Sequence, residues 1–320
     1  IDGIRRTSAD FNGLDPNEIE SVSILKDASA VAVYGLDANG VFIVTTKQGK
    51  AEKMSITYTG SVGFSQNAEQ QEWLDGPGYA YWYNKAQLLD GVAEENLRFS
   101  PEEIDRITNP GENEHIYGNT DWFDLLFRSD VTHTHALNVS GGTEAVKYYV
   151  SAGYSNIEGA AKGSDSEKFS ALAKVDAEYN EYLGFTAKID YATTSNTGYS
   201  SVVNPFDYAY STTRTMSAYN EDGSYYMSYR AAGSTGRDYI GYNILKELKN
   251  TGKSSKMDDF NALLALRLKL WKGLKYEGTF SWHTGNTNTR DWATAQSYKV
   301  TEIRGYEYGA YTEYDSEFSD

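Results

Sequence analysis

The chain has 320 residues, no Cys and a formal net charge of −16, with 29 basic against 45 acidic residues. The length favours two domains, or one domain with part of another. The charge argues against a nucleic-acid partner, because phosphate binding needs a basic face. The absence of Cys excludes disulfides and thiolate metal sites. No run of about 18 apolar residues occurs, which excludes a transmembrane helix but not a membrane β-barrel, whose strands present only alternate residues to lipid.

The two ends of the chain carry little pattern of their own. The first residues are IDG, without a Met or a signal peptide, and the last are YDSEFSD, without a terminal-strand pattern. We therefore expect both ends to lie inside a longer protein, so that a missing targeting signal has no meaning.

The first fifty residues predict a compact α/β unit of short elements. Asp15 can cap a helix, Pro16 suits its first position and Glu18 its third. A strand is expected over 22–25 and another over 41–46. Between them, Asp27 caps a second short helix that ends near Tyr34 at Gly35, and Asn39-Gly40 forms a turn. A phosphate loop is disfavoured, because no GxxxxGK[ST] or glycine triplet is present.

Seven later segments alternate apolar and polar residues, as membrane-spanning β-strands do. They are 56–65, 135–140, 146–154, 169–179, 185–191, 260–270 and 274–283. Long connections (about 66–132, 195–257 and 287–320, with a medium one at 157–167) alternate with short turns near 142–145, 180–184 and 272–273. Outer-membrane barrels alternate in this way, because their periplasmic turns are tight and their outer loops are long. Aromatic residues beside the short turns suit an interfacial girdle: Tyr148, Tyr179, Tyr182, Phe185, Trp271 and Tyr276.

A family resemblance is carried by DPNEIESVSILKDASAVAVYG…ANGVFIVTTKQGK and by the preceding IDGI. This stretch resembles the end of the plug domain of SusC/RagA-type TonB-linked outer-membrane transporters, and DWFDLLFR at 121–128 resembles the stretch before the second barrel strand of that family. The plug-motif residues are Asp15, Pro16, Glu20, Lys26, Asp27, Tyr34, Gly35, Asn39 and Gly40. One departure is the shortened Leu36-Asp37-Ala38, where the family commonly has an arginine, so a charge contact made by that arginine cannot be assumed.

The resemblance implies a mainly β fold, with residues 1–50 as the C-terminal part of an α/β plug and 51–320 as the N-terminal part of the transmembrane barrel. Seven strands cannot close a barrel, since open edges in lipid leave unpaired backbone groups. The resemblance further implies a gated importer of oligosaccharides or peptides in the bacterial outer membrane, in contact with its lipid. Its partners would be the TonB energy-coupling complex, whose binding segment lies upstream, and a SusD-like surface lipoprotein. No cofactor is implied.

The sequence offers only weak candidates for a catalytic or metal site. His133 and His135 share a strand face but have no third metal ligand near in sequence, so ordinary polar residues are favoured over a metal site. Three pairs of adjacent acids (Glu94-Glu95, Glu102-Glu103, Asp258-Asp259) are better explained as solvated charge than as glycosidase carboxylates. No nucleophile elbow is present. The sequence therefore predicts no enzyme.

The two long connections are aromatic-rich, with helix-like spacing over 78–89 and a capping box beginning at Ser100. Their rings either pack within the loops or contact a ligand or partner. The candidate contacts are Trp82, Trp122, Tyr219, Tyr225, Tyr226 and Tyr229. An importer is thus the leading hypothesis. The alternative is a β-rich surface binding module or adhesin that transports nothing.

Overall fold

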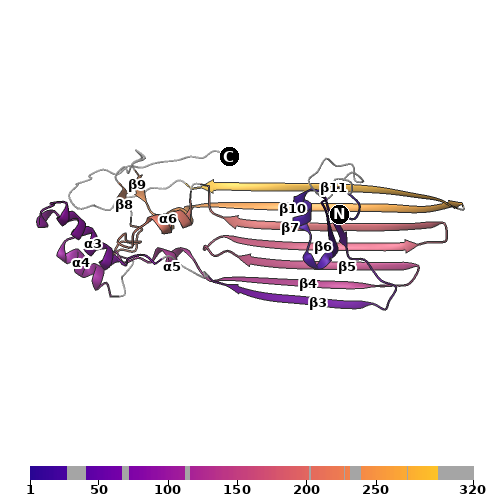
Figure 1. Ribbon diagram of the computed structural model, residues 1–320, viewed down its shortest axis with the longest axis horizontal. Helices are drawn as coiled ribbons and strands as arrows, with labels where there is room; N and C mark the ends of the chain where they lie inside the picture. The colour runs from indigo at the N-terminus through magenta and orange to yellow at the C-terminus, as the bar shows by residue number, and fades with distance from the viewer. Residues whose placement is uncertain are drawn as a thin grey trace.

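The computed structural model describes residues 1–26, 41–66, 72–111, 116–201, 203–226, 228–230, 239–271 and 273–294. A seven-stranded sheet runs through the molecule, with a small N-terminal unit against one face and a group of helices at one end (Figure 1). None of the helices in these ranges is long and apolar enough to cross a membrane.

The N-terminal unit, here called the plug segment (described residues 1–26 and 41–50), consists of four short elements. They are α1 (Ser8–Gly13), the 3-10 helix η1 (Pro16–Glu18), β1 (Ile19–Leu25) and β2 (Val41–Thr46). Thr7 caps α1 and Asp15 caps η1, and each cap is closed by an acidic residue at the third position, Asp10 and Glu18 respectively. β1 and β2 pair antiparallel. The predicted cap and both predicted strands are confirmed, whereas the helix and turn predicted between Asp27 and Gly40 lie outside the described residues.

The large sheet is antiparallel throughout, in the order β11-β10-β7-β6-β5-β4-β3. Its strands are β3 (Ser55–Ser65), β4 (Asp130–Gly142), β5 (Val146–Glu158), β6 (Asp165–Glu178), β7 (Leu183–Gly198), β10 (Thr251–Trp271) and β11 (Leu274–Ala293). All seven predicted strands are confirmed, and the tight turns all lie at one end of the sheet (Figure 1). The strands are longer than predicted, reaching 21 residues in β10.

The polarity of this sheet is inverted relative to that of a soluble protein. On β7, Lys188 is 6% exposed while the next residue, Ile189, is 54% exposed. The same holds across the sheet: the face covered by the plug segment carries Ser151, Ser170, Lys174, Thr186 and Lys188, all buried. The opposite, uncovered face carries apolar side chains, among them Val150, Phe169, Val175, Leu264, Leu266, Phe280 and Trp282. A polar inner face and an apolar outer band define a membrane-barrel wall.

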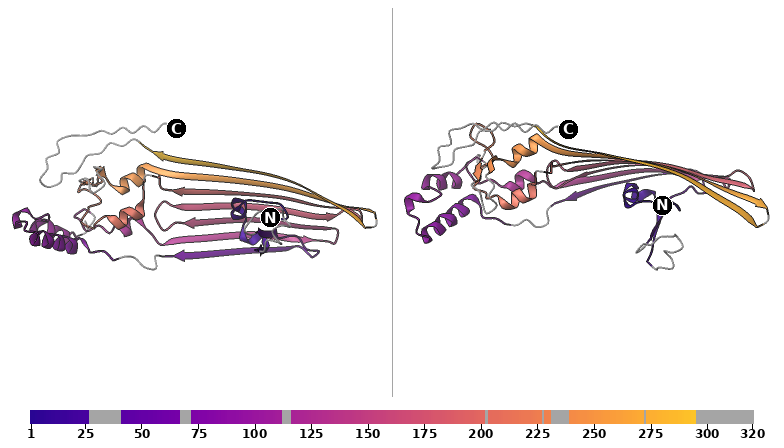
Figure 2. Two further views of the ribbon diagram at one scale, coloured as in Figure 1. Left: turned by 45° about the horizontal axis from the view of Figure 1, so that its top comes forward. Right: turned by 90° about the horizontal axis from the view of Figure 1, so that it is seen from above.

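The long connections fold at the end of the sheet opposite the tight turns (Figure 2). They contain α3 (Gly76–Leu89), η2 (Glu94–Asn96), α4 (Pro101–Thr108), α5 (Trp122–Leu126), α6 (Pro205–Ser211), α7 (Ile244–Asn250) and a small pair of strands, β8 (Ser228–Arg230) and β9 (Tyr239–Tyr242). Asp75 and Ser100 cap α3 and α4, each of which has a proline in its first turn. A hydrophobic core joins the two connections through Trp122, Phe123, Leu126, Ala209, Ala218 and Ile244. The loops therefore form a packed cap and not two independent excursions.

Candidate functional site

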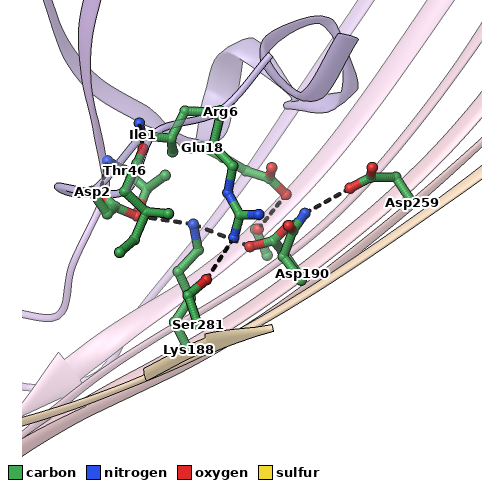
Figure 3. A network of polar contacts seen from close by, with 12 residues as sticks. Ile1, Asp2, Arg6, Glu18, Thr46, Lys188, Asp190, Asp259 and Ser281 are labelled. Carbon is green, nitrogen blue, oxygen red and sulfur yellow. Dashed lines mark hydrogen bonds and ion pairs between the residues drawn. The ribbon is translucent and has the colours of Figure 1, made fainter. Parts of the chain in front are cut away.

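The candidate site is the interface between the plug segment and the polar face of the sheet. In the side view, the plug segment projects from that one face and covers only part of the length of the strands (Figure 2). Polar side chains from both sides meet there in a connected network (Figure 3). Because this is the face that a barrel turns toward its lumen, contacts here decide how firmly a plug is held.

The capped turn η1 makes the deepest contact. The Glu18 side chain is 2% exposed. Its Oε1 accepts a hydrogen bond of 2.8 Å from the Ser151 hydroxyl on β5, and its Oε2 accepts one of 3.2 Å from the Asp15 backbone N–H. Burial raises the pKa of the Glu18 carboxyl, although these two hydrogen bonds act against it. The acid that closes the cap is therefore also the acid that binds the wall.

A glycine on β5 allows this close approach. A Cβ at Gly153 would lie 2.5 Å from Oδ2 of Asp15 and 2.8 Å from the Ser170 hydroxyl. On the neighbouring strand β6, the Lys168 ammonium donates to the carbonyl oxygens of Asn12 and Leu14, at 2.8 and 2.9 Å. The loop between α1 and η1 is thus held by backbone contacts that do not depend on its own side chains.

A second contact joins the start of the plug segment to β7. Lys188 Nζ lies 2.9 Å from Oδ2 of Asp2 and 3.1 Å from Oδ1 of Asp190, and Thr46 donates to Asp2 from both its backbone and its hydroxyl (Figure 3). Burial alone would raise the pKa of Asp2. The ammonium groups of Lys188 and Lys174 and the Thr46 hydrogen bond outweigh it and hold that pKa below its ordinary value.

A third contact brings Asp10 of α1 to the last two strands. His283 on β11 lies with Nε2 at 2.8 Å from Oδ2 of Asp259 on β10 and 3.1 Å from Oδ1 of Asp10. Asn261 donates to Asp259 and to Asp190, which links this cluster to the Lys188 pair. Sequence reasoning missed Asp10 and His283 as site residues and treated Asp259 only as half of an acidic pair. These residues come from three distant segments and form no local motif.

The predicted plug-motif residues divide between this interface and the surface. Asp15 caps η1 against Gly153, and Pro16 occupies the first position of η1. Glu20 and Lys26 are exposed on the described part of the plug segment. Asp27, Tyr34, Gly35, Asn39 and Gly40 lie outside the described residues, as does the shortened 36–38 segment. The gating role assigned to the motif stays a prediction.

The acidic pairs do not converge. Asp258 and Asp259 are consecutive on β10 and therefore point to opposite faces, with Asp258 accepting from the Tyr191 hydroxyl at 2.8 Å on the outer face. Glu94 and Glu95 lie in η2, and Glu102 and Glu103 in the first turn of α4. These placements favour the interpretation of the pairs as separate charges.

His133 and His135 lie side by side on the outer face of β4, with ring centroids 5.4 Å apart. His135 Nδ1 shares a 2.7 Å hydrogen bond with the Tyr58 hydroxyl. Among the described residues, the one group of three His or carboxylate ligands within reach of one ion is Asp10, Asp259 and His283, which does not include this pair.

The candidate contacts in the loops differ in accessibility. Trp122 is 2% exposed and packs in the loop core against Tyr208, which favours the packing interpretation for that ring. Trp82 is 59% exposed on α3. Its neighbour Tyr81, with Leu88 and Ile104, lines an apolar groove between α3 and α4 to which Trp82 itself does not contribute. Tyr219 and Tyr225 pair with ring centroids 5.7 Å apart, and Tyr226 is partly buried. The Tyr229 side chain lies outside the description.

Fold and site together define the class of this molecule: a stretch of β-barrel wall with part of a plug docked on its inner face. No protein-family model matches the chain. It is 33% identical to the TonB-dependent receptor SusC of Bacteroides thetaiotaomicron over 182 residues, and this aligned stretch covers 56% of this chain and 16% of the relative. It is 32% identical to the TonB-dependent receptor P26 of Formosa agariphila over 237 residues, and this aligned stretch covers 70% of this chain and 22% of the relative.

Solved structures show the same fold. The RagAB peptide importer in its "open-open" state matches with a TM-score of 0.71 at 24% identity, over 94% of this chain and 35% of that one. The "closed-closed" state matches with a TM-score of 0.66 at 25% identity, over 87% of this chain and 33% of that one. The chain belongs to the SusC/RagA-type TonB-dependent receptors, and it spans about a fifth of the length of the curated relatives it matches.

Proposed function

We propose that this chain forms the end of the plug and the first barrel strands of a TonB-dependent outer-membrane importer. The observation that carries the proposal is the plug segment docked by Asp2, Asp10 and Glu18 on the polar face of a sheet whose other face is apolar. An adhesin that transports nothing needs no structure inside its barrel. Such a protein does no covalent chemistry, and its work is binding, gating and conformational change.

The cargo we propose is an oligopeptide or an oligosaccharide, received with the help of a SusD-like lipoprotein at the loop end. The peptide part of this range is supported by the likeness to the RagAB peptide importer, which is 25% identical to this chain. The exposed ring of Trp82 and the Tyr219–Tyr225 pair supply stacking surfaces for such ligands or for the partner. Tyr226 and Tyr229 belong to the same proposal.

The test is uptake by cells that carry the full-length receptor. Labelled oligopeptides and oligosaccharides are offered to the wild type, to a strain lacking TonB and to a strain lacking the receptor. We expect accumulation of one of these classes that needs both TonB and the receptor. Equal cell-surface binding with and without TonB, with no accumulation inside the cell, would support the adhesin instead. Detergent-dependent solubility and heat-modifiable gel migration of the purified protein check that it is a membrane barrel.

A further inference from the structure

Three metal-ligating side chains from three distant segments converge where the plug segment meets the wall. They are Asp10 of α1, Asp259 of β10 and His283 of β11, and one ligand atom from each lies within 4.8 Å of the others. The Asp10 side chain is 5% exposed, Asp259 20% and His283 33%. This set joins the plug segment to both of the last described strands.

Each carboxylate is held by one oxygen and presents the other. Oδ2 of Asp10 accepts from the backbone N–H and the hydroxyl of Thr7, at 2.6 and 2.8 Å. Oδ1 of Asp259 accepts from the Asn261 amide at 2.6 Å. The remaining oxygens, Oδ1 of Asp10 and Oδ2 of Asp259, both face Nε2 of His283. Hydrogen bonds that orient ligands from behind are the usual support of a metal centre.

Two carboxylate oxygens compete at this point for a single donor position. A histidine Nε2 carries at most one N–H, yet two carboxylate oxygens lie within 3.1 Å of it. Asn261 adds an amide oxygen that is buried and accepts no hydrogen bond from the described residues. A cavity of about 30 Å³, lined in part by Asp10, Asp259 and Asn261, has room for a water-sized ligand.

We propose that Asp10, Asp259 and His283 bind a divalent transition-metal cation of the zinc class, which ties the plug to the barrel wall. One imidazole with two carboxylate oxygens is a donor set that suits Zn²⁺, and a water can complete the tetrahedron. Tetrahedral Zn²⁺ with bonds of about 2.0 to 2.1 Å places its ligand atoms roughly 3.3 Å apart. The distances of 2.8 and 3.1 Å from His283 Nε2 to the two carboxylate oxygens need a small opening to reach that value, and those two oxygens lie within 4.8 Å of each other.

The experiment uses the full-length receptor in detergent, stripped with EDTA and titrated with Zn²⁺ alone. Calorimetry gives the affinity, Co²⁺ absorption reports tetrahedral coordination, and thermal unfolding reports the hold on the plug. We expect Zn²⁺ to bind and to raise the unfolding temperature of the wild type. His283→Gln and Asp259→Asn, which keep the size of each side chain, are expected to lose this binding. Asn261→Ala removes an orienting group and weakens binding about 10- to 100-fold.

The matched control is the double variant His133→Ala with His135→Ala. It removes two histidines from the outer face and leaves the proposed site intact, so the Zn²⁺ affinity and the rise in unfolding temperature should be unchanged. The proposal is overturned if the wild type binds no Zn²⁺, or if His283→Gln binds it as tightly as the wild type. It is also overturned if only the His133/His135 variant loses binding. None of these results depends on a transported substrate, so they are separate from the uptake test.

Discussion

Lys188 shows at a single residue why this interface matters. Its ammonium is buried in the wall, where an unpaired charge would be costly, and it persists because Asp2 and Asp190 both lie within 3.1 Å. Asp190 belongs to the same strand, whereas Asp2 belongs to the plug segment. Withdrawal of the plug therefore leaves Lys188 with one carboxylate and open to water. The ion pair between Lys188 and Asp2 is therefore stabilising while the plug is docked, and water can take the place of Asp2 when the plug withdraws.

Asp2→Asn tests that contact. The substitution leaves Lys188 one carboxylate short, and we expect the docked plug to lose about 3 kcal/mol at neutral pH, the lower end of the cost of breaking a buried pair, because Asp190 remains. Because the folded-state pKa of Asp2 is lowered from 3.8, its contribution is present above pH 3.8 and is lost as the pH falls through that lower pKa. The two proteins should thus converge in acid. Urea-dependent protease cleavage of the plug measures the difference.

The control for this prediction is Glu20→Gln, which removes an exposed carboxylate from the same segment. It should leave the free energy of plug docking, measured by the same cleavage assay, within about 0.5 kcal/mol of the wild type. An equal loss in both variants would mean that the total charge of the plug, and not the Lys188 pair, holds it.

Gly153→Val tests the close approach on β5. The added Cβ alone would lie 2.5 Å from Asp15, so either η1 or β5 has to shift. We expect a loss of about 1 to 3 kcal/mol in plug docking, as for overpacking. Gly63→Val on β3 is the matched control, because a Cβ there meets nothing nearer than 3.9 Å. Equal plug protection in the two variants would rule out a packing role for Gly153.

At the scale of elements, the apolar alternation located each of the seven strands of the large sheet but not their full length, and it missed the short pair β8 and β9. The outer end of β10 runs TGKSSKM, in which neither face is apolar, so the periodicity ends before the strand does. Its backbone nevertheless pairs with β11 as far as Thr251 and Ala293. Above the lipid band, strand pairing needs no apolar face. Hydrophobic pattern therefore predicts the membrane-embedded part of such a strand and misses its extension.

Two tryptophans of the loop cap allow a packing role to be distinguished from a role in contacting cargo or partner. Trp122→Ala removes a ring that is 2% exposed, and we expect it to destabilise the cap by about 3 to 5 kcal/mol. Trp82→Ala removes one that is 59% exposed and should change stability by less than about 0.5 kcal/mol. If α3 contacts cargo or partner, Trp82→Ala lowers that affinity while Trp122→Ala lowers the unfolding temperature. A loss of stability in Trp82→Ala would assign that ring to packing.

At the scale of the whole molecule, the plug could be recognised from its local motif but its docking could not be predicted. The cap at Asp15, Pro16 and Glu18 is contiguous, and its turn follows from those three residues. The partners of the cap, Ser151 and Gly153, lie more than a hundred residues further along the chain. The Asp10, Asp259 and His283 cluster likewise exists only once α1 rests on the wall. Contacts of this kind depend on where the plug segment docks on the sheet, which no local pattern records.

A covalent tether tests whether this plug must move for transport. An ideal Cβ at Gly153 lies 3.2 Å from Cγ of Asp15, close to the roughly 3 Å that separates the Cβ of one half-cystine from the sulfur of the other. Asp15→Cys with Gly153→Cys should therefore form a disulfide in the oxidised protein, and this chain contributes no other thiol. We expect uptake to be lost in the oxidised double variant and restored by a reductant, because the docked plug then becomes free to leave the wall.

The two single cysteine variants control for damage to the cap of η1 and for crowding at β5. Each should transport equally with and without reductant, at whatever level its substitution leaves. Gel mobility under non-reducing conditions confirms that the tether has formed. Full transport by the tethered protein would mean that cargo passes while η1 stays on β5, and the moving part of the plug would then have to lie beyond Glu18. Reversible loss of uptake instead assigns the gate to the capped turn η1, which is part of the motif that carries the family resemblance in the sequence.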